Sequence, residues 1–188
     1  PRPHVWRAKR PLACDTSPGP CNERFAGAGI PQTQDGWRAF RAMLVTIPDL
    51  VSCISGAILY DETIRQKTTG GALFVKVLTD AGIVPGIKVD LGAKPLAGHP
   101  GERITEGLDG LRPRLQQYGE MGARFAQWRA VVAIGKGIPC HASIQDNATA
   151  PDCHHPLGQE PGPVRLGRPQ VMHPAPPPPG RVRTRPLD

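Results

Sequence analysis

The sequence has no long hydrophobic run, since no stretch approaches the roughly eighteen consecutive apolar residues that a membrane-spanning helix needs. It also lacks a Cys-x-x-Cys pair, and no apolar segment of a secretory signal precedes its cysteines. The cysteines are odd in number: Cys14, Cys21, Cys53, Cys140 and Cys153. These absences argue against a disulfide-stabilised secreted domain and against a helical membrane protein. We therefore expect free thiols, a cytoplasmic location and no membrane partner.

Acidic residues are too few to balance the basic ones, because 16 aspartates and glutamates face 23 lysines and arginines, for a net charge of +7. Such a charge attracts phosphate groups of any kind, whether in nucleic acids, anionic membranes or small metabolites. The arginines are scattered along the chain, and there is no lysine-rich arm. We therefore expect no nucleic-acid partner, although a basic nucleic-acid binder remains the third hypothesis below.

Proline and glycine are abundant, with 23 and 22 residues of 188, but they are unevenly spread. Residues 1–36 are repeatedly broken by proline and are interpreted as a degenerate N-terminal segment. Residues 37–150 alternate apolar and polar patterns and form the expected folded part. Residues 151–188 hold nearly half of the prolines, including Pro176–Pro179, and we expect a disordered, Pro/Gly/Arg-rich tail.

The folded part alternates short apolar runs with helical spacing. We expect strands at 54–60, 83–90 and 125–134, and helices that begin near Trp37 or cover about 73–82, 105–122 and 142–150. Strands separated by helices pair in parallel, so the pattern predicts an α/β fold. Charged residues in or at the ends of these strands, such as Lys88, Asp90 and Arg129, favour a barrel, where strand ends carry active sites.

Several motifs then identify a family. Gly86-Ile87-Lys88-Val89-Asp90, Glu106-Gly107-Leu108-Asp109-Gly110-Leu111 and Trp128-Arg129 resemble the class I fructose-bisphosphate aldolases, with the bacterial and plant-like branch most similar. The match is dense over 35–150. Weaker similarity places a first strand at 9–17 and a fifth strand across 159–171.

The resemblance implies a (β/α)8 TIM barrel, of which this chain would hold about the first four to five strands. It implies reversible cleavage of fructose 1,6-bisphosphate to dihydroxyacetone phosphate and glyceraldehyde 3-phosphate, a glycolytic reaction that runs through a lysine Schiff base without cofactor or metal. In such chemistry an amine condenses with the ketose carbonyl, and cations hold the phosphates. The expected partners are sugar phosphates, and a homo-oligomer is compatible with the family.

Site residues follow from the resemblance position by position. Asp15 matches an aspartate of the first strand that binds and polarises the substrate, and Lys88 matches an active-site lysine of the third strand. These two are the expected catalytic residues. Ser17, Arg24 and Arg129 match positions that bind substrate.

Other positions depart from the family. Gln127 stands in place of a fourth-strand lysine, Trp37 in place of an arginine, and Arg168 and Gln170 in place of two proton-transferring glutamates. The sixth-strand Leu-Lys-Pro motif, which carries the Schiff-base lysine, has no counterpart. We therefore expect this chain to be inactive as given. The alternative is a non-catalytic descendant that binds sugar phosphates or an aldolase subunit.

A metal site is not expected. Cys140-His141 and Cys153-His154-His155 offer zinc-type ligands, but their spacing matches no common zinc finger or ribbon. Gly135-Lys136-Gly137 lacks the remainder of a phosphate-binding loop and is interpreted as a turn.

Overall fold

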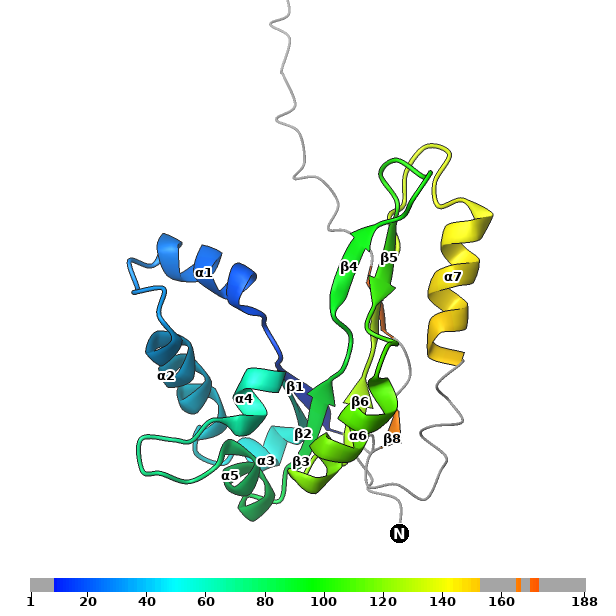
Figure 1. Ribbon diagram of the computed structural model, residues 1–188. Helices are drawn as coiled ribbons and strands as arrows, with labels where there is room; N and C mark the ends of the chain where they lie inside the picture. Colours follow the sequence, from blue (N-terminus) through cyan, green and yellow to red (C-terminus); the bar gives the residue numbers. More distant parts are fainter. Residues whose placement is uncertain (1–8, 153–164, 167–169, 173–188) are drawn as a thin grey trace, which may run out of the picture.

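The computed structural model describes residues 9–152, 165–166 and 170–172. Its main sheet contains five parallel strands in the order β1-β2-β3-β6-β8 (Figure 1). Their bounds are β1 Arg10–Cys14, β2 Ile54–Leu59, β3 Val84–Lys88, β6 Phe125–Gln127 and β8 Arg165–Leu166. The three strands expected at 54–60, 83–90 and 125–134 are adjacent, parallel and in that order, as predicted. The strand order follows the chain order, as in a segment of a TIM barrel.

Helices connect these strands and pack against the sheet. Their bounds are α1 Pro18–Gly27, α2 Gln34–Val45, α3 Leu50–Cys53, α4 Asp61–Arg65, α5 Phe74–Asp80, α6 Leu111–Glu120 and α7 His141–Asp152. Helix α3 contacts β2, while α4 and α5 contact β3. No helix within the described part of the chain is both long and apolar enough to cross a membrane.

One buried core lies between the sheet and the helices. Leu59 of β2 and Ile87 of β3 are fully buried in it, together with Phe74 and Leu78 of α5. Trp128 is 1% exposed and belongs to the same cluster. Strands β2 and β3 are buried along most of their length because helices cover them, which accounts for their nearly continuous apolar sequences.

The prediction of a helix at 105–122 is wrong for residues 105–110. Residues Gly92–Pro95 (β4) and Arg103–Glu106 (β5) instead form an antiparallel hairpin, and α6 begins only at Leu111. Gly107 has a φ of 127°, and a Cβ there would lie 2.9 Å from the Leu91 nitrogen. Only glycine fits this close approach of two backbones, which prevents the helix from starting earlier.

The strand expected at 125–134 is divided into two. Strand β6 ends at Gln127, and β7 covers Arg129–Val131 in a separate sheet with β9, Gln170–Met172. The Arg129 amide donates to the Asp90 side chain at 3.2 Å instead of continuing the ladder of β6. The side chain of Asp90 therefore ends the pairing at this position.

The two ends of the chain are described in part. Within 1–36, β1 lies where the resemblance placed a first strand, and α1 follows it. Within 151–188, β8 and β9 are short strands inside the segment expected to resemble a fifth strand. The other residues expected to form a disordered tail lie outside the described residues, as does Arg168.

Gly86 gives a test of the packing between β3 and β6. It pairs with Phe125, and a Cβ at Gly86 would lie 2.2 Å from the Phe125 ring. We expect Gly86→Ala to lower the free energy of unfolding by about 1–3 kcal/mol, because the buried ring must move. Urea unfolding monitored by circular dichroism measures this change.

Gly19→Ala is the matched control, because no heavy atom lies within 4 Å of a Cβ built there and the residue lies in α1. It should leave stability unchanged or raise it by up to about 1 kcal/mol through helix propensity. Equal urea midpoints for Gly86→Ala and the parent chain would contradict the described packing.

Candidate functional site

A cavity of about 200 Å³ lies where β1, β2 and β3 end. Asp15 follows the last residue of β1, Tyr60 follows that of β2, and Lys88 is the last residue of β3. The carboxyl ends of parallel barrel strands are the usual place for an active site. All five residues predicted from the sequence line this cavity: Asp15, Ser17, Arg24, Lys88 and Arg129.

Lys88 and Asp90 form a buried ion pair in the cavity wall. The Lys88 Nζ lies 2.5 Å from Asp90 Oδ1 and donates to the Asp90 carbonyl at 3.0 Å. Lys88 is 8% exposed and Asp90 is 3% exposed. Charged groups this deeply buried require partners, so the pair fixes the direction in which the lysine amine points.

Asp90 also holds three segments together. Its Oδ1 accepts from the Gly92 amide at the start of β4, and its Oδ2 accepts from the Arg129 amide at the start of β7, each at 3.2 Å. The sequence alone marks Asp90 as a charged residue at a strand end but gives it no specific role. Its position two residues after Lys88, at the end of an apolar strand, is the signal that points to it.

Tyr60 is a second residue that sequence reasoning missed. The Lys88 Nζ lies 6.0 Å from the centroid of its ring, within the range of a cation–π contact. Tyr60, Lys88, Asp90 and Leu91 also line an adjoining cavity of about 310 Å³, so they form the wall between the two spaces. An aromatic residue that ends a buried strand was the available signal.

Ser17 and Arg24 approach the cavity from α1. Ser17 is the N-cap residue of this helix, and Arg24 lies in its last turn. Arg24 is exposed, unlike Lys88, and therefore belongs to the rim of the cavity. The predicted residues thus come together from β1, α1, β3 and β7.

The positions that depart from the family are placed as follows. Gln127 pairs with Lys88 in the β3–β6 register and is not among the residues that line the cavity. Gln170 pairs with Arg129 in the β7–β9 register. Trp37 lies in α2 and donates from Nε1 to Asn22 Oδ1 at 2.8 Å, a contact between α2 and α1.

Asp15 has a pKa above its ordinary value of 3.8. Burial raises the pKa most, and the negative charge of Asp90 raises it further. A backbone hydrogen bond and the positive charges of Lys88 and Arg129 oppose this shift without reversing it. A carboxyl group of this kind can hold or accept a proton beside a bound ligand.

These features define a class of protein: a partial TIM barrel whose strand ends hold an amine, carboxyl groups and guanidinium groups around a small polar cavity. The family profile described as "Glycolytic: Fructose-bisphosphate aldolase class-I" matches residues 4–174. The chain therefore belongs to the class I fructose-bisphosphate aldolase family.

Individual relatives agree with this assignment. A class 1 fructose-bisphosphate aldolase of Xanthomonas campestris pv. campestris is 53% identical over 161 residues, which are 86% of this chain and 48% of that protein. The relative from Xylella fastidiosa is 52% identical over 168 residues, 89% of this chain and 50% of the other. Cytosolic fructose-bisphosphate aldolase 5 of Arabidopsis thaliana is 45% identical over 86% of this chain and 45% of its own length.

A solved structure shows the same fold. The fructose-bisphosphate aldolase of Plasmodium falciparum, crystallised with TRAP and a small-molecule inhibitor, superposes with a TM-score of 0.84 at 34% identity. The superposition covers 91% of this chain and 50% of the other. The chain thus spans about half the length of the relatives it matches.

The raised pKa of Asp15 predicts a pH-dependent stability difference. An acid whose folded pKa exceeds its unfolded value binds its proton more tightly in the folded state, so stability falls as pH rises between the two values. Asp15→Asn removes this titration. We expect the variant to have a higher Tm than the parent chain at neutral pH, and the difference to vanish below about pH 3.8, where both forms of the parent are protonated.

Thermal unfolding of both chains across this pH range measures the difference. Asp109→Asn, at an exposed position, controls for the loss of one negative charge. A variant that is less stable than the parent at neutral pH, with a gap that does not change in acid, would show that the Asp15 carboxylate is well accommodated.

Proposed function

We propose that this chain supplies the substrate-binding part of a fructose-bisphosphate aldolase site in the cytoplasm. In the complete reaction of the family, fructose 1,6-bisphosphate is reversibly cleaved to dihydroxyacetone phosphate and glyceraldehyde 3-phosphate. With only the residues that it contains, this chain would bind such sugar phosphates without cleaving them. The observation that carries the proposal is the convergence of Asp15, Ser17, Arg24, Lys88 and Arg129 on one cavity.

The cavity has the chemistry to hold a sugar phosphate. Arg24 and Ser17 come from one side, and Lys88 and Arg129 come from β3 and β7. Guanidinium groups bind phosphate oxygens through two parallel hydrogen bonds, and a hydroxyl group adds a third donor. Asp15 supplies an acceptor for a sugar hydroxyl group between these cations.

Two features oppose turnover by these residues alone. Among the described residues, Lys88 supplies the one amine that lines the cavity. Its Nζ lies 2.5 Å from Asp90 Oδ1. A charged amine in such a pair is a poor nucleophile. Gln127 replaces a cation at the resemblance position of the fourth strand, and Gln170 replaces a proton-transferring carboxylate beside Arg129. Groups that act as a unit in catalysis fail together.

The other hypotheses are weaker. A non-catalytic descendant that binds an aldolase subunit would use a surface rather than the cavity. Nucleic-acid binding would use scattered surface charge, whereas Lys88 is nearly buried in an ion pair. A homo-oligomer remains compatible with the proposal. Titration with fructose 1,6-bisphosphate and, separately, with DNA at two salt concentrations distinguishes sugar-phosphate binding from nucleic-acid binding. Binding of DNA through scattered surface charge is expected to be abolished at the higher salt concentration.

Binding is tested with Arg24→Ala, a variant at an exposed position that should fold normally. We expect isothermal titration to show fructose 1,6-bisphosphate binding to the parent chain and binding about tenfold to a hundredfold weaker to the variant, because one charged hydrogen bond contributes about 1.5–3 kcal/mol. Arg38→Ala is the matched control, since Arg38 pairs with Asp35 on the surface of α2. Equal affinities of Arg24→Ala and Arg38→Ala would place the ligand elsewhere.

Catalysis is tested by trapping a Schiff base. The purified chain is mixed with dihydroxyacetone phosphate and borohydride and is analysed by mass spectrometry. We expect no stoichiometric adduct, because the Lys88 amine is held by Asp90. A stoichiometric mass increase on Lys88 would show that this lysine forms the imine, and the chain would then be an active enzyme.

A further inference from the structure

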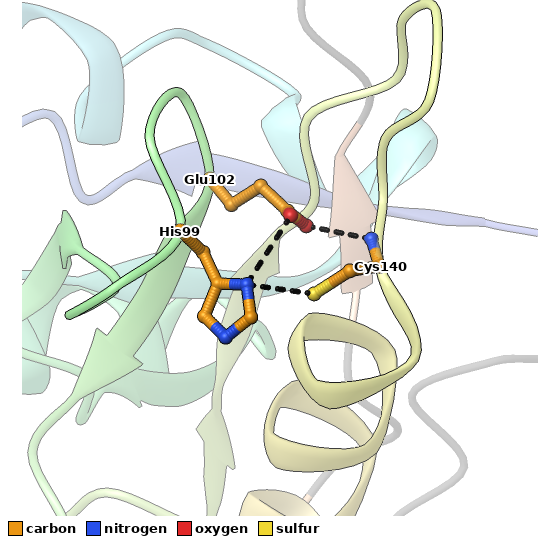
Figure 2. Close-up of side chains that lie close together, drawn as sticks. All are labelled: His99, Glu102 and Cys140. Atoms are coloured by element: carbon orange, nitrogen blue, oxygen red, sulfur yellow. Dashed lines mark hydrogen bonds and ion pairs between the residues drawn. The ribbon is translucent and has the colours of Figure 1, made fainter.

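Three metal-ligating side chains meet at the far end of the β4–β5 hairpin, away from the sugar-phosphate cavity. His99 and Glu102 belong to the turn between β4 and β5, and Cys140 immediately precedes α7 (Figure 2). One potential ligand atom from each residue lies within 4.8 Å of the other two. The Cys140 Sγ lies 3.3 Å from His99 Nδ1, which lies 4.0 Å from Glu102 Oε1.

Backbone contacts hold these groups in place. The Glu102 amide donates to the His99 carbonyl at 3.1 Å, which closes the turn that brings the two residues together. The Glu102 Oε2 accepts from the Cys140 amide at 2.9 Å, and the Cys140 Sγ accepts from the Ser143 amide at 3.4 Å. Glu102 is 4% exposed, although it is a carboxylate. The donor atoms are therefore positioned before any ligand binds.

The Glu102 carboxyl group accepts hydrogen bonds from Cys140 and Ser143. Burial raises the pKa of its carboxyl group, but hydrogen bonds from the amide and thiol of Cys140 and from Ser143 lower it more, so that the pKa lies below its ordinary value. The positive form of His99 adds to the lowering.

We propose that His99, Glu102 and Cys140 bind one zinc ion, through Nδ1, Oε1 and Sγ. Zinc accepts this mixture of sulfur, nitrogen and oxygen ligands, whereas magnesium and calcium prefer oxygen alone and copper(I) prefers sulfur. Tetrahedral zinc with Zn–S of about 2.3 Å and Zn–N of about 2.05 Å separates sulfur and nitrogen by about 3.6 Å. The observed separation of 3.3 Å is close to this value, and Glu102 Oε1 lies 4.0 Å from the same nitrogen.

Two simpler readings explain less. Capping of α7 accounts for the Cys140 sulfur and the Glu102 carboxylate, but not for His99, whose Nδ1 faces both (Figure 2). A reactive thiolate–imidazolium pair accounts for His99 and Cys140. That pair, however, gives no role to the buried Glu102 carboxylate, whose Oε1 lies 4.0 Å from the same His99 nitrogen. A divalent cation satisfies all three groups together.

The proposed zinc has three protein ligands, which leaves its fourth position to water. It lies outside the sugar-phosphate cavity and takes no part in that reaction. Leu91 and Gly92 at the base of the hairpin line the cavity, whereas the ligands lie at its tip. Zinc would fasten this tip to the start of α7. In the sequence, the neighbours of Cys140 are His141 and the Cys153-His154-His155 group, whose spacing predicts no metal site. The partners come from a hairpin about forty residues upstream, which spacing within one motif cannot reveal.

Cobalt(II) substitution tests the proposal in the full chain after metal is removed with a chelator. We expect one equivalent of cobalt to give a thiolate-to-metal charge-transfer band and the intense visible bands of four-coordinate cobalt, and zinc to displace it. Cys140→Ser should abolish the charge-transfer band. His99→Ala, at a partly exposed position that should not disturb folding, should weaken zinc binding at least about tenfold.

Cys53→Ser is the matched control, since Cys53 is a free and exposed cysteine in α3. It should leave the cobalt spectrum and zinc affinity unchanged. The proposal is overturned if no band forms, or if the band survives in Cys140→Ser and is lost in Cys153→Ser, which would assign the metal to the tail. It is also overturned if iodoacetamide modifies Cys140 at the same rate with and without zinc.

Discussion

The arrangement of the cavity depends on the buried contact between Lys88 and Asp90. Two opposite charges removed from water require each other, and removing one partner of such a pair typically costs about 3–5 kcal/mol. Asp90 receives the Lys88 amine and the amides of Gly92 and Arg129. These contacts join the end of β3 to the starts of β4 and β7. The same carboxylate that orients the amine therefore also shapes the wall around it.

The contact between Lys88 and Asp90 has opposite effects on ligand binding and on catalysis. It gives Lys88 a fixed position at the strand ends, which favours recognition of a bound phosphate. It also keeps the amine bound to a carboxylate, which opposes its approach to a carbonyl carbon as a nucleophile. Among the described residues that line the cavity, Lys88 supplies the single amine, and such a site is suited to binding. The relatives are about twice as long as the matched part of this chain.

Much of the fold could be predicted because it follows local patterns. The runs at 54–60 and 83–90 are apolar and bounded by helical spacing, and they form β2 and β3. The hairpin and the break at Trp128 could not be predicted in this way, because each depends on a tertiary contact. Gly107 must approach Leu91, and the Asp90 side chain must receive the Arg129 amide. The predicted site residues came from resemblance. Asp90 stands out in the sequence as a charged residue at a strand end, but its role, like that of Tyr60, becomes visible only through contacts with Lys88.

The sequential order of the strands has a consequence for the way the chain folds. Each new strand pairs with the one formed before it, so Gly56 meets Val84 across 28 residues and Gly86 meets Phe125 across 39. Because loop-closure entropy grows only with the logarithm of length, these two closures differ by about 0.3 kcal/mol. No single pairing therefore dominates the entropic barrier. The sheet can therefore grow by sequential addition of strand–helix units, each of which extends a core that is already formed.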